Sequence, residues 1–98
     1  MENDVERVMT AWTTLCEAAL DLAKRIIPGE SDPTLITVVD AAVRRGLIES
    51  SETPATLALA DSVERLRTND VELTAPLADS MLRTIDHLRR LITTLAYD

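Results

Sequence analysis

Apolar residues recur at spacings of three and four in four separate segments of the chain, which is the period of an α-helix with one buried face. The first segment, residues 4–27, is the longest. Its apolar stripe fills two neighbouring rows, made up of Val5, Val8, Met9, Trp12, Leu15, Cys16, Ala19, Leu22, Ala23, Ile26 and Ile27. Asn3 and Glu6 have the spacing of a capping box, and Pro28-Gly29 follows the last apolar residue. This segment is predicted to be a long amphipathic helix.

The second segment has a helix-start signal at one end and a helix-stop signal at the other. It opens on Ser31-Asp32-Pro33, a polar cap with proline at the first helical position, and it closes on Arg44-Arg45-Gly46. Two cations favour the negative end of the helix dipole, and Gly46 suits a left-handed cap that lets Leu47 pack back. The residues expected to face inward are Ile36, Val39, Ala42 and Val43. The β-branched run 36–39 is the one stretch that resembles a strand.

The third and fourth segments follow the same pattern. The third runs from about Ser51 to about Arg67, and the fourth from Thr74-Ala75-Pro76 to about Ala96. In the third, the apolar face is expected to hold Leu57, Ala60, Val63 and Leu66, with Leu59 beside them. In the fourth, the seam consists of Leu77, Met81, Ile85, Leu88, Leu91, Ile92 and Leu95. Both segments predict amphipathic helices.

Only a few residues separate consecutive segments, and short connections make neighbouring helices antiparallel. We therefore expect an all-α fold, a single helical domain over residues 1–98. Its architecture is predicted to be a small antiparallel four-helix bundle with two long and two short helices. The helical content should be at least about 65%, with no sheet.

The charge of the chain limits the classes of molecule that it can bind. The formal net charge is −7, which repels phosphate backbones and anionic membrane surfaces, and no block of basic residues offsets it. No apolar run reaches the roughly 20 residues of a membrane span. The acidic start, Met1-Glu2-Asn3-Asp4, differs from the basic and then apolar start of a signal peptide. A cytoplasmic protein that binds proteins is the expectation.

The sequence contains few residues that could catalyse a reaction or bind a metal ion. Cys16 is the only cysteine and His87 the only histidine, so no disulfide and no Cys-His or His-His metal set can form within one chain. No Glu-x-x-His pair occurs, and the carboxylates are scattered. We interpret His87 as a residue at the edge of the apolar seam of the fourth segment. We interpret Cys16 as a small buried residue, because Glu17 disfavours a thiolate. Neither a metal nor another cofactor is expected.

Trp12 is one of only two aromatic residues, with Tyr97. In so aromatic-poor a chain it is either the central residue of the core or the anchor of an interface, since tryptophan is enriched at binding hot spots. The first apolar stripe is wider than one core seam requires. Val8, Trp12, Leu15 and Ala19 are therefore predicted to contact a partner protein, and we expect a homodimer.

The order of features from Leu47 to Ile92 resembles the C-terminal half of HEPN-superfamily helical domains. In that family a short helix ends in arginine, followed by asparagine, a few residues, histidine, a polar loop and a long final helix. Active members cut RNA with the arginine and the histidine across a dimer interface. Here Arg67 stands at the arginine position, Thr68 where asparagine is usual and Glu72 where histidine is usual. Segments 45–48 and 72–76 also resemble the family.

The departure at Glu72 changes what the resemblance implies. A carboxylate cannot replace an imidazole as proton donor near neutral pH, and it repels an RNA phosphate. The resemblance therefore implies a helical bundle that is catalytically inactive and retains the family's pairing through long helices.

These observations lead to three hypotheses about the function of the chain. The leading hypothesis is a non-enzymatic helical interaction module that homodimerises or forms a small subunit of a larger assembly. The second is an acidic inhibitor of the antitoxin or immunity type, steered to a basic partner by its negative charge. The third is a HEPN-type ribonuclease, against which the missing histidine and the charge both argue.

Overall fold

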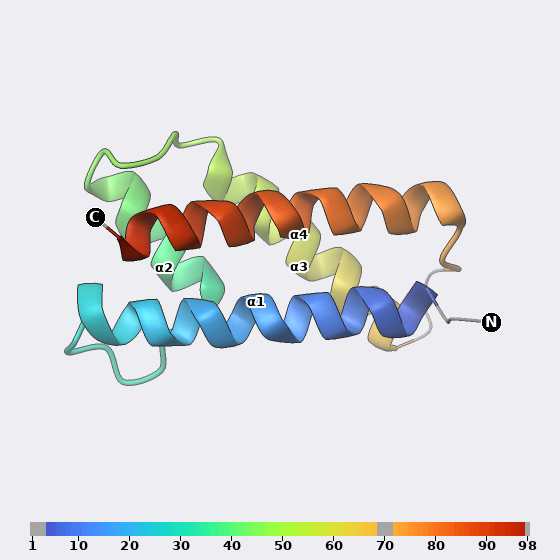
Figure 1. The fold of residues 1–98 in the computed structure, drawn as a ribbon, viewed down its shortest axis with the longest axis horizontal. Helices are drawn as coiled ribbons and strands as arrows, with labels where there is room; N and C mark the ends of the chain where they lie inside the picture. Colours follow the sequence, from blue (N-terminus) through green and yellow to red (C-terminus); the bar gives the residue numbers. More distant parts are fainter. Residues whose placement is uncertain (1–3, 69–71, 98) are drawn as a thin grey trace.

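The computed structural model describes residues 4–68 and 72–97, of which 78% are helical, and it contains no strand within these ranges. The helices are α1 (Asp4–Ile26), α2 (Leu35–Arg44), α3 (Glu52–Arg67) and α4 (Ala75–Ala96) (Figure 1). The predicted all-α class, with two long and two short helices, is confirmed. The β-branched run 36–39 is helical, because its side chains fit the helical burial pattern around it.

α2 begins two residues later than predicted. Thr34 has extended backbone angles (φ −123°, ψ 175°), and its Oγ1 accepts a hydrogen bond from the Thr37 backbone N at 3.4 Å. In return, the Thr34 backbone N donates to Thr37 Oγ1 at 3.2 Å. This reciprocal capping box satisfies two backbone donors, so Ser31-Asp32-Pro33 lies in the loop before the helix.

The starts of α3 and α4 agree with the prediction, whereas the predicted cap of α1 lies partly outside the described residues. α3 and α4 begin within a residue of the predicted positions, and Thr74 Oγ1 caps α4 by accepting from the Leu77 backbone N at 3.3 Å. The capping box predicted for α1 depends on Asn3, which lies outside the described residues.

Gly46 ends α2 in the predicted left-handed conformation, with φ of 73°. Its backbone N donates to the Val43 carbonyl, and the Leu47 backbone N donates to the Ala42 carbonyl, each at 3.0 Å. This pair of bonds is a Schellman motif, which satisfies the last carbonyl groups of a helix. The Arg45 guanidinium donates to the Ile26 carbonyl at the end of α1, so the two helix ends are tied together.

α1 and α4 run parallel, which corrects the predicted antiparallel arrangement. Near the starts of both helices Ala11 and Leu82 line one groove, and near their ends Leu22 and Ala96 line another. Figure 1 shows both helices running in the same direction, with α3 running back behind them. The short α2, about 15 Å long, cannot return along the roughly 35 Å of α1. The return is divided between α2 and α3, so α4 starts beside the start of α1.

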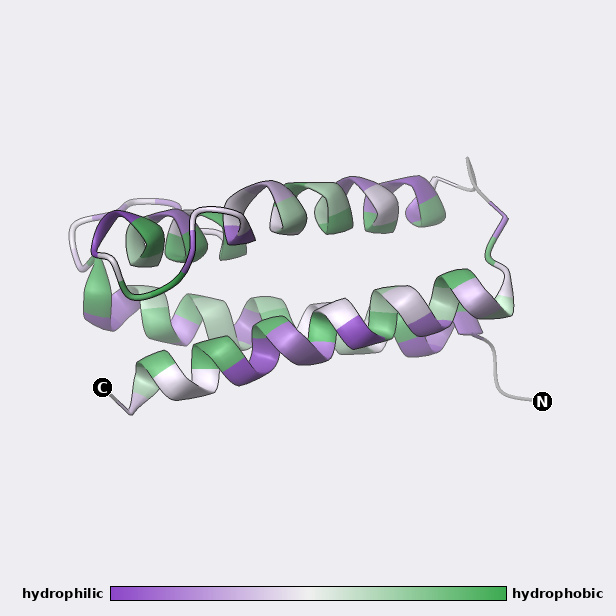
Figure 2. Ribbon diagram, turned by 90° about the horizontal axis from the view of Figure 1, so that it is seen from above, coloured by the Kyte–Doolittle hydropathy of each residue, from purple (hydrophilic) through white to green (hydrophobic). Residues whose placement is uncertain are grey.

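α1 packs against all three other helices. Figure 2 shows two layers, α1 with α4 and α2 with α3. The buried apolar residues are Val8, Leu15, Ala19, Leu22, Ala23, Leu35, Val38, Val39, Ala42, Leu59, Val63, Leu66, Ala78, Met81, Ile85, Leu88 and Ile92. The inward faces predicted for α2 and α4 are buried or partly buried.

The buried face of α3 differs from the prediction. Thr56 is fully buried, with its hydroxyl donating to the Glu52 carbonyl at 2.7 Å, whereas Leu57 is 49% exposed. Because its hydroxyl is satisfied within the helix, threonine can occupy a core position that the apolar pattern alone assigned to leucine.

Ion pairs contribute little to the arrangement of the helices. Among the described residues, every pair but one joins two positions on the same helix. The exception is His87 on α4, whose Nε2 lies 3.1 and 3.2 Å from the carboxylate oxygens of Glu52 at the start of α3. His87 is largely exposed and lies within α4, next to the buried Leu88, at the edge of the apolar seam where the sequence placed it.

Replacing Gly46 by alanine should destabilise the protein by about 1–2 kcal/mol, because a side chain is strained in the left-handed conformation. Urea unfolding followed by circular dichroism measures this loss. Gly29→Ala is the matched control, since Gly29 has no positive φ and its added Cβ would meet nothing within 4 Å. Equal effects of the two substitutions would contradict the assigned role of Gly46.

Candidate functional site

The structure separates the four residues predicted to contact a partner. Val8, Leu15 and Ala19 are fully buried in the core of the chain itself, because α1 is covered by three other helices. They are not available to a partner, and the prediction is corrected for these three. Trp12 is only partly buried, and it packs against the core from its edge. Trp12 therefore lies at the edge of the core and is not its central residue, and its role as an interface anchor stays a prediction.

Trp12 lines a shallow groove of about 280 Å³ between α1 and the end of α3. We call this the Trp12 groove. Its lining residues are Trp12, Thr13, Cys16, Glu17 and Leu20 from α1, and Arg67 from α3. Leu20 is 42% exposed and was not part of the predicted stripe. Its spacing, four residues after Cys16 and eight after Trp12, places it on the same helix row and was the available clue.

Two residues that the sequence analysis singled out for different reasons, Arg67 and Trp12, lie in the same groove. Arg67 was singled out by the family resemblance and Trp12 by its rarity. Arg67 is half exposed at the last residue of α3, with its Nη1 3.4 Å from Glu64 Oε2. Glu17 lies on the α1 wall, so the two walls of the groove carry opposite charges.

Arg67 also influences Cys16. Burial raises the pKa of the Cys16 thiol above its ordinary value, and the positive charge of Arg67 lowers this pKa by a smaller amount. The sequence showed only the acidic neighbour Glu17, because the arginine comes from another helix. The thiol therefore stays protonated at neutral pH, and the groove presents it as a small apolar surface.

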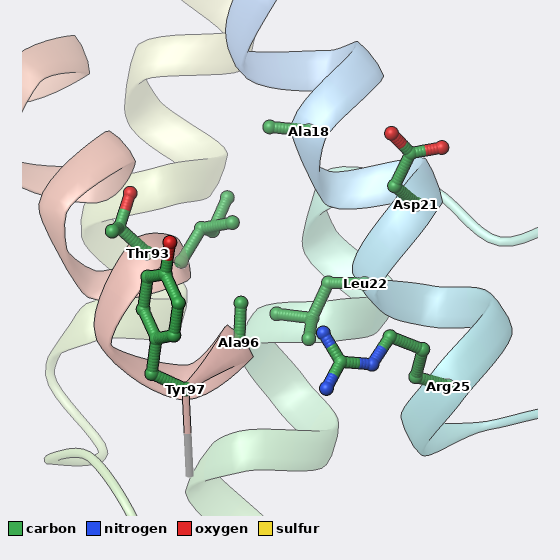
Figure 3. Close-up of a pocket in the computed structure, with 8 residues that line it drawn as sticks. Ala18, Asp21, Leu22, Arg25, Thr93, Ala96 and Tyr97 are labelled. Atoms are coloured by element: carbon green, nitrogen blue, oxygen red, sulfur yellow. The ribbon is translucent and has the colours of Figure 1, made fainter.

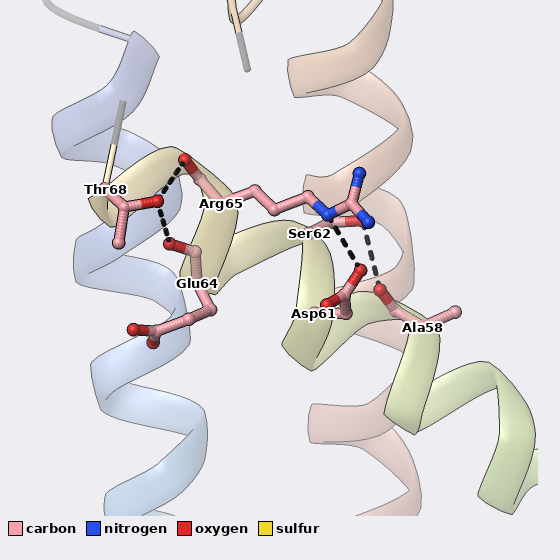
Figure 4. A network of polar contacts seen from close by, with 6 residues as sticks. All are labelled: Ala58, Asp61, Ser62, Glu64, Arg65 and Thr68. Atoms are coloured by element: carbon pink, nitrogen blue, oxygen red, sulfur yellow. Dashed lines mark hydrogen bonds and ion pairs between the residues drawn. The ribbon is translucent and has the colours of Figure 1, made fainter. Parts of the chain in front are cut away.

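Thr68 terminates α3. Its Oγ1 donates to the carbonyl oxygens of Glu64 and Arg65, each at 3.3 Å, while Arg65 pairs with Asp61 at 3.0 Å (Figure 4). These contacts all lie within one helix, so this part of the resembled motif has a local structural role. Glu72 is exposed before α4 and does not line the Trp12 groove. Residues 69–71 of the motif lie outside the described residues.

A second groove, of about 340 Å³, lies between the C-terminal ends of α1 and α4 (Figure 3). Asp21 and Arg25 border it on α1, and Tyr97, which is 88% exposed, borders it on α4. Its larger apolar floor residues, Leu22 and Ile92, are almost completely buried and offer a partner little surface. The exposed large side chain of this groove is Tyr97 alone, whereas the Trp12 groove combines the partly buried Trp12 with the exposed Leu20 on one face of α1, and it is the candidate site for a partner.

No group of three or more His, Cys, Asp or Glu residues in the described ranges is arranged to hold a metal ion. In the same ranges, no helix has the length and apolar character needed to traverse a bilayer.

Comparison of the chain with protein-family models, curated proteins and solved structures gives no match. The resemblance to HEPN domains therefore stays a prediction from the motif alone.

Replacing Arg67 by glutamine should raise the pKa of Cys16 further, because a positive charge that favours the thiolate is removed. The rate of iodoacetamide alkylation, measured against pH, follows the thiolate fraction, so its curve should move to higher pH. Arg65→Gln is the matched control, since Arg65 is on the same helix and does not line the groove. Identical curves for both variants and the wild type would show that Arg67 does not act on Cys16.

Proposed function

We propose that the chain is a cytoplasmic helical interaction module that forms a homodimer through the Trp12 groove. The observation that carries this proposal is that α1, after filling the core, still leaves Trp12 partly exposed and Leu20 42% exposed on one groove. Covering such side chains with a partner removes apolar area from water, at about 25 cal/mol per Å². A partly buried tryptophan is also a rigid anchor, of the kind enriched at interface hot spots.

The distribution of charge supports self-association at this place. A net charge of −7 makes two copies repel each other. Residues 8–16 of α1 nevertheless contain no charged residue, and the two charged residues that line the groove, Glu17 and Arg67, have opposite signs, so the groove itself adds no net negative charge.

The interface is small, because the groove is shallow and only one face of α1 contributes to it. Small interfaces give weak complexes, and we expect a dissociation constant in the micromolar range. A small subunit of a larger assembly would use the same groove with another protein. An acidic inhibitor of a basic partner would instead bind through its charged surface, with an affinity that falls as salt rises.

Replacing Leu20 by alanine should weaken the dimer at least about tenfold without lowering the stability of the monomer, because Leu20 is exposed in the single chain. Trp12→Ala should weaken the dimer and also cost about 2–4 kcal/mol of folding, since Trp12 packs against the core. Sedimentation equilibrium over a concentration series measures association, and urea unfolding of the dilute protein measures stability.

Leu57→Ala is the matched control, because Leu57 is as exposed as Leu20 but lies on α3 outside the groove. It should change neither quantity. A wild-type chain that sediments as a monomer at about 100 μM would contradict the homodimer. A tight, salt-sensitive complex with a basic protein from the same host would then support the inhibitor hypothesis.

We further expect the purified protein not to cleave RNA, with or without added metal ions. Arg67 is engaged by Glu64, and Glu72 stands where the resembled ribonucleases have histidine. A labelled RNA panel incubated with the wild type and with Arg67→Ala tests this. Cleavage that disappears in the Arg67 variant would establish the ribonuclease hypothesis instead.

A further inference from the structure

The layer formed by α1 and α4 has an outer face that the proposed function does not use. The α2–α3 layer covers one side of these two helices, and none of the described helices covers the other side (Figure 2). We call this the outer face and define it by residues that line the grooves between α1 and α4, namely Arg7, Thr14 and Asp21 of α1 and Asp86, Arg89 and Thr93 of α4.

The outer face is separate from the Trp12 groove. Thr14 lies two residues from both Trp12 and Cys16, which is about 200° around the helix. The two surfaces therefore lie on opposite sides of α1, and a partner on one leaves the other free.

The charges of the outer face are arranged symmetrically about the level of Thr14. Arg7 and Asp21 stand seven residues before and after Thr14. Seven residues are about two turns, so the three residues share one row, with the two charges about 10.5 Å on either side of Thr14. On α4, Asp86 and Arg89 line the same groove as Thr14, so the midpoint between these two charges lies near the level of Thr14.

We infer that the outer face binds a second copy of the chain, about a two-fold axis that lies in the plane of contact and crosses both helices at the level of Thr14. Such an axis sets α1 antiparallel on α1 of the second copy, and α4 antiparallel on α4. Arg7 of each copy then faces Asp21 of the other. Asp86 of each copy faces Arg89 of the other, because the axis passes between them.

The second copy is the occupant because the charges complement themselves in this register. Position 14+k of one α1 opposes position 14−k of the other, and α4 is paired about the midpoint of Asp86 and Arg89. No charged residue of α1 or α4 then directly opposes one of the same sign. Asp21 forms no ion pair with another described residue. Arg7 holds Asp4 at 3.3 Å, and its guanidinium has further donor hydrogens for a second carboxylate.

The uncharged residues of the outer face can be covered at little cost. Thr14 Oγ1 donates to the Thr10 carbonyl at 3.0 Å, and Thr93 Oγ1 donates to the Arg89 carbonyl at 2.9 Å. The buried Thr56 of the core satisfies its hydroxyl in the same way. Covering Thr14 and Thr93 therefore leaves neither hydroxyl donor without a partner, and side chains of this size let helices approach closely.

The outer face is large enough for a dimer. Helices of 23 and 22 residues are about 34 Å long, and two of them side by side present a face about 20 Å wide. The face therefore offers up to roughly 700 Å² per copy, close to the approximately 800 Å² that each partner contributes to a standard interface.

Charge reversal in the Leu20→Ala chain tests the inference. That parent lacks the exposed leucine of the Trp12 groove, so the outer face is its remaining route to association, and it should dimerise with a dissociation constant below about 100 μM. D21R sets arginine against Arg7, and R7D sets aspartate against Asp21, so each should raise this constant about tenfold or more. The double variant R7D/D21R restores opposite charges and should recover most of the affinity. Sedimentation equilibrium at low salt measures the constant.

Two controls separate this effect from overall charge and from stability. D61R and R65D make the same changes of net charge at an ion pair on α3, outside the outer face, and they should change the dissociation constant less than about threefold. R7D and D21R place an acid nearer the start and a base nearer the end of α1, so neither opposes the helix dipole. Urea unfolding of the dilute variants verifies that they are folded.

Cross-linking at position 14 gives an independent readout. In the same parent, C16S/T14C carries its single thiol next to the axis, so a short bis-maleimide should join two chains rapidly. C16S/L57C carries its thiol on α3, and cross-linking should be at least about tenfold slower under the same conditions.

The outcomes separate this inference from the proposed use of the Trp12 groove. Rescue by R7D/D21R, with rapid cross-linking of C16S/T14C, supports the outer face. A Leu20→Ala chain that is monomeric at about 500 μM, or a dimer that shows no rescue, overturns it and leaves the proposed function standing. A wild-type dimer that Leu20→Ala does not weaken, but that D21R weakens and R7D/D21R restores, overturns the groove as the dimer contact and keeps the outer face.

Discussion

The packing of α1 against all three other helices is the constraint on which the rest of this structure depends. Its apolar stripe covers two neighbouring rows, and a row can be buried only where another helix lies over it. α4 covers one flank and the α2–α3 layer covers the other. This coverage places Val8 and Leu15 in the interior and leaves Trp12 and Leu20 at the edge. The candidate site therefore lies along the incompletely covered edge of the stripe that forms the core.

The local features of the fold could be predicted because each depends on a few neighbouring residues. Gly46 ends α2 and Thr74 caps α4 through contacts within five residues. The start of α2 was misplaced because two local signals compete there. Pro33 favours a first helical turn, but the hydroxyl groups of Thr34 and Thr37 satisfy each other's backbone donors, and the cap that forms two bonds prevails.

The arrangement of the helices could not be predicted in the same way. Short connections specify that the chain turns, but not how far a short helix carries it. α2 is too short for the chain to travel back along the whole of α1 within this one helix, and this is seen only when the lengths of both helices are known. α3 completes the way back, and as a consequence α1 and α4 run parallel. The candidate site shows the same limit. The rarity of Trp12 was visible in the sequence, but the approach of Arg67 to Cys16 results from a crossing of α1 and α3 that no local spacing encodes.

The confinement of ion pairs to single helices has a consequence for how this protein can change. Most surface ion pairs join two residues of one described helix, the pair of His87 with Glu52 being the exception. Apart from these two residues and Arg45, which binds the Ile26 carbonyl, the surface charges can be exchanged without moving one helix relative to another. Apolar cores of this kind also tolerate substitutions that conserve volume. The surface of this chain can therefore diverge, or be redesigned to suit a different partner, while the scaffold that holds the Trp12 groove remains the same.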